Sequence, residues 1–259
     1  MQGVEKYAKT VQKNKEIEFD GFVFYPLTVN DYELYYAARP AFELFQASLP
    51  IKLARLSWLP CLWEIDKESG SKLVPLVLCV IGKALHLPEV NGGYRIEAVQ
   101  NGDELKGFFF PDFALFMSLQ QTDEVRRIIA AQNEYEIPNE NQNPELVEAA
   151  QYNARMKSQA LKTDFEALVY SVSVNSGADY DEVWEWPMRK FLKTSAAVDR
   201  KLGFLLCGLA EAQGATYKHG NPYPSWKYDR DNDLPLGFET LASIEAGAKG
   251  LLPEAQTQS

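Results

Sequence analysis

The sequence predicts a mainly helical α+β fold: a helical bundle-like body with one small antiparallel sheet. Long stretches repeat apolar residues every three to four positions, which is the period of a helix with one buried face. Two other stretches carry a turn dipeptide next to short β-prone runs. Hydrophobic residues make up 46% and aromatic residues 12% of the 259-residue chain, which is enough to fill a core.

A β-hairpin opens the predicted fold. The run EIEFDGFVFYPLT places Asp20-Gly21 between two apolar-rich segments, and this dipeptide favours a type I′ turn because both turn residues adopt positive φ. Thr28 stands at the N-cap position of a helix through VNDYELYYAARP. A second helical piece is expected from Phe42 to Pro50, carried by further apolar residues.

Helical patterns and a second hairpin follow. The segments LARLSWLPCLWEIDK and LVPLVLCVIGKALHL are expected to be helical, with Pro60 and Pro75 starting, kinking or dividing them. Between Tyr94 and Phe110 the hairpin signal returns, with a turn at Asn101-Gly102. From Pro111 onward the pattern predicts helix, first in DFALFMSLQQ and then in TDEVRRIIAAQNEY.

The chain is expected to divide into three parts. An N-terminal α+β part with both hairpins covers 1–137, a helical part with an aromatic arm covers 138–240, and a mobile tail covers 241–259. The polar run EIPNENQNPE marks the first boundary. Beyond it, Asn143 is the expected N-cap of a helix through NPELVEAAQYNARMKSQALK.

The later helices carry clear start and stop signals. The run TDFEALVYSVSVNSG predicts a capped helix that Gly177 ends. Asp179 and Glu182 have the spacing of a capping box in front of YDEVWEW. Pro187 starts a long helix that Gly214 terminates.

Charge and cysteine content exclude several classes of protein. The 36 acidic against 26 basic residues give a net charge of −10, which opposes binding to phosphate backbones, so no nucleic-acid partner is expected. Cys61, Cys79 and Cys207 lie far apart in apolar runs and predict buried thiols in a reducing compartment. The run LVPLVLCVIG is too short to span a bilayer, so we expect no membrane partner and a cytoplasmic location.

The sequence carries no recognisable catalytic or cofactor motif. It lacks the phosphate-binding glycine motifs, the H-E-x-x-H zinc motif and the G-x-S-x-G nucleophile motif. His86 and His219 lie in unrelated segments, so metal-ligand spacing is missing as well. We therefore expect no catalytic residues, no cofactor, no metal and no enzyme activity.

The acidic run DRDND resembles the start of a calcium-binding loop. Such a loop needs glycine at its sixth position and glutamate at its twelfth. Counted from Asp229, those positions hold Leu234 and Thr240, so a solvated turn is the expected structure. Asp229, Asp231 and Asp233 are still the candidates that a metal-dependent enzyme would use.

Aromatic residues form the candidate partner-binding set. The aromatic arm, residues 220–228, joins prolines to Tyr223, Trp226 and Tyr228, which suits packing against a surface of its own domain or of a partner. Trp184 and Trp186 stand beside acidic residues in DYDEVWEW. They could form a cation-binding surface, or the acids could favour a helix start while a tryptophan packs in the core.

The segment TDFEALVYSVSVNSGADYDEVWEWPMRKFLKTSAAVDR and the arm KHGNPYPSWKYDR resemble the helical segment of tail assembly chaperones of long-tailed bacteriophages and prophages. There, a helix precedes a small-residue break, an acidic capped turn and another amphipathic helix. The resemblance implies a non-catalytic chaperone in the host bacterial cytoplasm that coats the tape-measure protein and delivers tail-tube protein to it.

Other functions stay open at the level of the sequence. A structural component of the virion, in the tail or its connector, would use the arm to bridge neighbouring subunits. A metal-dependent enzyme is the remaining class. The sequence also leaves open a homo-oligomer and the identity of the client.

Overall fold

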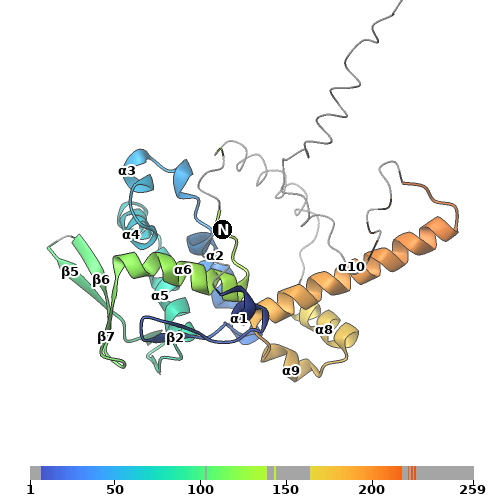
Figure 1. The fold of residues 1–259 in the computed structure, drawn as a ribbon, viewed down its shortest axis with the longest axis horizontal. Helices are drawn as coiled ribbons and strands as arrows, with labels where there is room; N and C mark the ends of the chain where they lie inside the picture. Colours follow the sequence, from blue (N-terminus) through green and yellow to red (C-terminus); the bar gives the residue numbers. More distant parts are fainter. Residues whose placement is uncertain are drawn as a thin grey trace, which may run out of the picture. The chain divides into compact units, whose positions relative to one another are not determined.

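The computed structural model describes residues 7–102, 104–138, 143, 164–217, 221, 223 and 225 (Figure 1). The chain divides into two compact units, 1–195 and 196–259. Helices dominate, and the sheets among the described residues are small and antiparallel, which confirms the predicted mainly α, α+β class. The helix expected from residue 144 and the tail from residue 241 lie outside the described residues.

The first hairpin forms as predicted. After α1 (Ala8–Gln12), strands β1 (Ile17–Phe19) and β2 (Phe22–Phe24) pair in antiparallel register. Asp20 and Gly21 have φ values of 49° and 81°, as a type I′ turn requires. The strands bury the apolar side chains Ile17, Phe22 and Phe24.

Thr28 begins the next helix as expected. The Asp31 carboxylate accepts hydrogen bonds from the Thr28 N–H (3.1 Å) and hydroxyl (3.0 Å) at the short helix η1 (Val29–Asp31). Helix α2 (Tyr32–Phe42) follows and continues past Pro40. Pro40 lies in the last turn of the helix, where its missing N–H removes one helical hydrogen bond.

The helical piece expected from Phe42 to Pro50 is wrong. Phe42 belongs to α2, and the following residues form only the short helix η2 (Gln46–Ser48) before α3 (Ile51–Ala54). Phe42 and Phe45, two of the apolar residues that suggested one helix, are both buried. Phe42 ends α2, and Phe45 stands just before η2.

Two helices then form the centre of unit 1. Pro60 and Pro75 lie in the first turns of α4 (Trp58–Ser69) and α5 (Leu73–Ala84), so they help to start these helices. The Asp66 carboxylate of α4 accepts hydrogen bonds from the first two amides of α5, at 3.0 and 2.8 Å. Helix α5 packs against α2 and α4.

The hairpins do not share a sheet, so the predicted single sheet is wrong. The pair β3 (Glu89–Val90) and β4 (Gly93–Tyr94) is separate from β1–β2, and so is a three-stranded sheet of order β5-β6-β7. The Tyr94 ring lies against Gly82 of α5, where a Cβ atom would fall 2.3 Å from ring atoms.

The helix expected from Pro111 is also wrong over its first residues. Strands β5 (Glu97–Asn101) and β6 (Glu104–Phe110) form the predicted hairpin, but Leu115–Ser118 add a third strand, β7. In β7 the side chains alternate: Met117 is buried and Phe116 is exposed opposite β6. Alternation is the strand period, and it prevails because β6 provides a pairing edge.

Helix α6 (Leu119–Asn133) follows this sheet directly and packs against α4 (Figure 1). The side-chain oxygen of Gln121 accepts hydrogen bonds from the Ser118 N–H (2.7 Å) and hydroxyl (2.9 Å), which fixes the first turn. The helix buries Val125, Ile128 and Ile129.

The last helices follow the predicted signals with one exception. Helix α8 (Phe165–Ser176) ends at Gly177, whose φ is 74°. The Asp179 side chain accepts the Asp181 N–H (2.9 Å) and starts α9 (Tyr180–Trp184). Glu182 does not complete a capping box, because its carboxylate accepts the Trp186 indole N–H (3.1 Å).

Helix α10 (Met188–Ala212) runs from unit 1 into unit 2. Its first residue is tied to the body, because the Met188 N–H donates to the Leu27 carbonyl at 2.7 Å. Its end is the predicted one: Gly214 has φ 91°, and the Ala215 N–H donates back to the Ala210 carbonyl at 2.9 Å.

A buried arginine joins three of these helices. The Arg126 guanidinium of α6 donates to the Phe42 carbonyl (2.7 and 3.0 Å) and to the Leu44 carbonyl (2.9 Å) after α2. It also lies 5.3 Å from the ring centroid of Trp58, whose indole N–H donates to the Ala41 carbonyl at 2.8 Å. The carbonyls at the end of α2 are therefore satisfied by side chains of α4 and α6.

Replacing Arg126 by methionine is expected to destabilise the protein by about 1–3 kcal/mol, because the carbonyls at the end of α2 stay buried without donors. Arg127→Met is the matched control, since Arg127 is exposed and pairs with Glu124 of its own helix at 3.1 Å. Its loss is expected to be within about 0.5 kcal/mol. Urea unfolding of both variants measures the difference, and equal losses would contradict the role given to Arg126.

Candidate functional site

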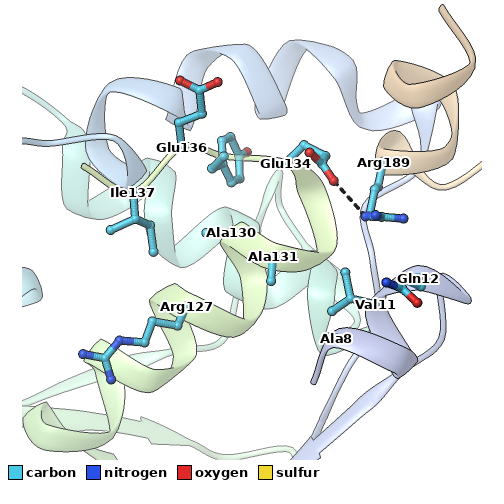
Figure 2. Close-up of a pocket in the computed structure, with 11 residues that line it drawn as sticks. Ala8, Val11, Gln12, Arg127, Ala130, Ala131, Glu134, Glu136, Ile137 and Arg189 are labelled. Carbon is cyan, nitrogen blue, oxygen red and sulfur yellow. Dashed lines mark ion pairs between the residues drawn. The ribbon is translucent and has the colours of Figure 1, made fainter. Parts of the chain in front are cut away.

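Unit 1 contains a pocket of about 350 Å³ between α1, the end of α6 and the start of α10 (Figure 2). Small apolar side chains of α1 and α6 line it, among them Val11, Ala130 and Ala131. Its charged lining comes from the middle of α6, from the residues that follow its end and from α10: Arg127, Glu134, Glu136 and Arg189. The pocket therefore combines an apolar lining with charges of both signs.

Glu134 is the central charged residue of this pocket. It ends α6 in the left-handed conformation, with φ 60°, at a position that helices usually fill with glycine. Its carboxylate forms an ion pair with Arg189 Nε of α10 at 2.8 Å (Figure 2). It forms a second one with Lys193 Nζ of the same helix at 2.9 Å. The buried Arg189 Nε meets the carboxylate without hydrogen-bond alignment. One strained residue thus ties the end of α6 to the first turns of α10.

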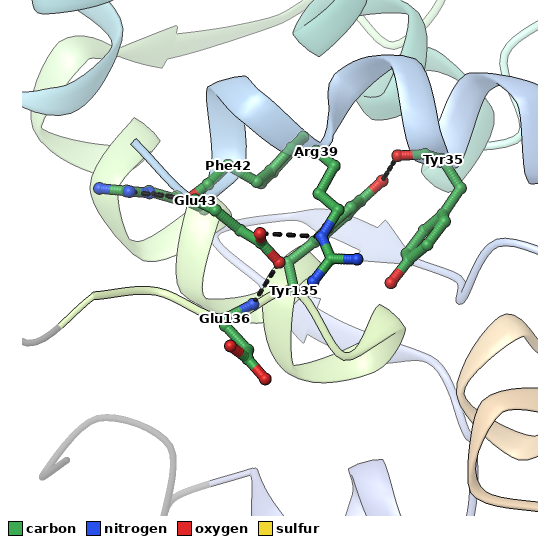
Figure 3. Close-up of polar contacts among 7 residues, drawn as sticks. Tyr35, Arg39, Phe42, Glu43, Tyr135 and Glu136 are labelled. Atoms are coloured by element: carbon green, nitrogen blue, oxygen red, sulfur yellow. Dashed lines mark hydrogen bonds and ion pairs between the residues drawn. The ribbon is translucent and has the colours of Figure 1, made fainter. Parts of the chain in front are cut away.

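A polar network supports the chain just after Glu134 (Figure 3). The Glu43 carboxylate accepts the Glu136 N–H at 3.0 Å and pairs with Arg39 at 2.8 Å. The Tyr135 hydroxyl donates to the Tyr35 carbonyl at 3.1 Å. The chain that borders the pocket is therefore held by the Glu43 side chain at the end of α2 and by the Tyr35 carbonyl within α2.

Tyr135 is also part of a buried aromatic column. Its ring stacks on Tyr35 and on Phe42, with centroid distances of 4.6 Å in both cases. Burial raises the pKa of Tyr35 and of Tyr135 well above the ordinary value of a tyrosine. Both phenols are therefore held in their neutral form by the folded structure.

The leucine face lies on the part of α10 that belongs to unit 2. It consists of Leu202, Leu205, Leu206 and Leu209, which are 43%, 55%, 67% and 59% exposed. Their spacing places them on one side of the helix. The stretch 202–210 (LGFLLCGLA) contains no charged residue.

The leucine face continues a seam that begins in the core. Met188, Phe191, Ser195 and Val198 precede Leu202, Leu205 and Leu209 with alternating steps of three and four residues, which is the spacing of a coiled-coil seam. The first residues of the seam are buried, and its leucines are exposed. One spacing pattern thus places buried residues near the start of α10 and exposed leucines further along it.

Tyr223 of the aromatic arm packs on α10. The Tyr223 ring lies against Gly203, where a Cβ atom would fall 2.8 Å from ring atoms. Closer to the helix end, the neighbouring Cys207 thiol raises the pKa of the Tyr217 hydroxyl. At Tyr223 the packing is therefore within the chain, while Trp226 and Tyr228 lie outside the described residues.

The two tryptophans of the predicted partner-binding set lie in unit 1. Trp186 is buried, with Lys190 Nζ 3.4 Å from its ring centroid. Trp184 is half-buried beside the rings of Tyr32 and Phe165. This placement agrees with the interpretation in which tryptophan packs in the core behind an acidic helix start.

The histidines, the cysteines and the acidic run were also considered as chemical groups in the sequence. Those within the described residues pack in the fold, and the rest are not described. The His86 ring stacks on Tyr25 with centroids 4.0 Å apart. All three cysteines are free thiols, and burial raises the pKa of Cys61 and Cys79. Within the described ranges, no group of three or more His, Cys, Asp or Glu side chains converges as a metal site would require. His219 and the acidic run from residue 229 are not described.

The sequence analysis missed the Glu134 ion pairs and the leucine face. Glu134 has no local signal, because a non-glycine residue in the left-handed conformation is identified only from coordinates. The leucine face did have a local sequence signal. The spacing of leucines in KLGFLLCGLAEA continues the seam that begins at Met188.

Comparisons of the chain with protein-family models, with curated protein sequences and with solved structures find no match. Among the described helices, none has both the length and the apolar character that crossing a membrane requires. The case for a function accordingly depends on the leucine face, the aromatic arm and the resemblance noted in the sequence.

Glu134 provides a test of how α10 is held. Glu134→Ala removes both ion pairs and keeps the strained backbone, so we expect a loss of about 1–2 kcal/mol, a value discounted for the half-exposed Lys193. Glu134→Gly removes the same ion pairs but relieves the strain, so it is expected to be about 1 kcal/mol more stable than the alanine variant. Urea unfolding should rank wild type, glycine and alanine in that order. A glycine variant more stable than wild type would refute a net contribution from the carboxylate.

The buried phenols predict sensitivity to alkali. Since Tyr35 and Tyr135 have raised pKa values in the folded state, their contribution to stability is complete below the unfolded-state value of about 10 and is lost as pH rises above it. Tyr135→Phe removes one of these groups, so its stability should fall less steeply above that pH. Tyr170→Phe, at an exposed tyrosine, is the control. Urea unfolding across the alkaline range measures the slopes, and identical slopes for all three proteins would contradict the assignment.

Proposed function

We propose that this chain is a non-catalytic assembly chaperone that binds an amphipathic helix of a client protein on the leucine face of α10. The observation that carries this proposal is the exposure of four leucines on one uncharged helix face. Contiguous exposed apolar surface of this kind marks interaction sites in soluble proteins. Anchors at positions i, i+3, i+4 and i+7 are those by which one helix receives another.

The chemistry of the face specifies the client. A charged side chain placed against 202–210 would lose water without gaining an ionic partner, because this stretch has none to offer. The coiled-coil spacing of the seam favours a helix with apolar residues at the same steps. The expected client is therefore a long helical protein that exposes an apolar stripe before it assembles.

The resemblance to tail assembly chaperones supports a specific client. In that role the chain binds the tape-measure protein of a long-tailed bacteriophage or prophage and presents it to the tail-tube protein. An assembly chaperone of this type works in the cytoplasm of the bacterial host. The Glu134 ion pairs contribute by fixing the first turns of the helix that carries the leucine face.

Co-purification with the tail proteins encoded beside this chain tests the proposal. The tape-measure protein is expected to be retained by the wild type and lost by the double variant Leu205→Gln, Leu209→Gln. Glutamine has nearly the helix propensity of leucine, so the change acts on the face and not on the helix. Losing two buried leucine contacts should weaken binding at least tenfold, since about 1.4 kcal/mol corresponds to a factor of ten.

The control is the double variant Lys201→Gln, Glu211→Gln, which changes polar positions that flank the uncharged stretch. It should retain the tape-measure protein, and circular dichroism should show unchanged helix content in both variants. Failure of the wild type to retain any tail protein would refute the chaperone. Finding the chain in purified virions would favour a structural component, because an assembly chaperone leaves the particle.

A further inference from the structure

Tyr223, one of the described residues of the aromatic arm, lies beside the leucine face. Tyr223 lies against Gly203, while Leu206, three residues further along α10, is 67% exposed. Residues three apart on a helix are neighbours on its surface, so the Tyr223 ring stands next to Leu206 without covering it. We infer that Tyr223 forms a side wall of the docking surface and helps to select the helix that binds there. This inference rests on the proposed function.

Gly203 is what allows the ring to lie so close to the helix. An alanine methyl group at that position would approach three atoms of the Tyr223 ring at 2.8–2.9 Å. Separations this short force the ring to move outward. Gly203 therefore sets the distance between the aromatic wall and the leucine face.

The arm is held before a partner arrives. The Asn221 side-chain oxygen accepts the Tyr223 N–H at 2.8 Å, which fixes the backbone on the N-terminal side of the ring. In the sequence, prolines precede and follow Tyr223, so few backbone conformations are available to it. A wall fixed in advance loses little entropy on binding.

The ring also has surface left for a partner. Tyr223 is 40% exposed, although it packs on the helix. Tyrosine offers apolar area from its ring and a hydroxyl that can stay hydrated at the edge of an interface. The partner that fits is thus an amphipathic helix with an apolar stripe on the leucines and one flanking side chain against the Tyr223 ring.

Two glycine variants of the same helix separate this inference from a general effect on α10. Gly203→Ala displaces the ring, whereas Gly208→Ala meets no atom within 4 Å. Both changes add the same methyl group and the same helix propensity. In the absence of a partner, hydrogen exchange of the Tyr223 amide should become faster in Gly203→Ala and stay at the wild-type rate in Gly208→Ala. Equal rates in all three proteins would overturn the contact between Gly203 and the arm.

Binding is then measured with the tape-measure protein encoded beside this chain as the probe. Gly203→Ala and Tyr223→Ala are each expected to weaken its binding about fivefold, which corresponds to roughly 1 kcal/mol, with Gly208→Ala unchanged. Circular dichroism confirms that the variants are folded. If Gly203→Ala and Tyr223→Ala bind like wild type while the leucine double variant does not, the wall is overturned and the proposed function stands. If the wild type does not bind the probe, both are refuted.

Discussion

The arrangement of the helices in unit 1 depends on which groups donate hydrogen bonds to the backbone carbonyls at the end of α2. A helix end leaves carbonyl groups without partners, and at α2 these groups are buried. Arg126 and Trp58 donate to them from α6 and α4, and this requirement fixes three helices against one another. A charged group in the interior is tolerated because each carbonyl carries a partial negative charge and the Trp58 ring lies under the guanidinium. With α6 fixed in this way, its end has a defined place, and Glu134 can reach two cations of α10.

Strong local signals were the part of the fold that sequence could predict. The turn at Asp20-Gly21 and the helix end at Gly177 were predicted correctly. Both need a positive φ, which few residues other than glycine adopt easily. The prediction failed in DFALFMSLQQ, because that run satisfies a helical period over its whole length and a strand period over Leu115–Ser118. The pairing edge of the preceding strand β6 decides between them, and the spacing within the run itself does not show that edge. The Glu134 ion pairs were beyond reach for the same reason, since Arg189 and Lys193 come from a distant segment.

The candidate site illustrates a different limit of sequence patterns. The seam of α10 has the same spacing from Met188 to Leu209, and amphipathic spacing indicates that a face will be covered without saying what covers it. In the structure the first part of that seam is buried, and the leucines are not. The aromatic arm shows the converse case: its composition indicated that it would lie against a surface, and only the coordinates show Gly203 of its own chain as that surface.

The leucine face also has a consequence for the free protein as a colloid. Four exposed leucines make any two copies attractive to each other at short range, and at high concentration such contacts lead to clustering. The chain carries a net charge of −10, and none of the charged residues lies within 202–210. Long-range repulsion between copies therefore opposes their approach without altering the chemistry of the face itself. Salt screens this repulsion. The ionic strength therefore sets the protein concentration above which attraction between leucine faces exceeds the repulsion and copies associate.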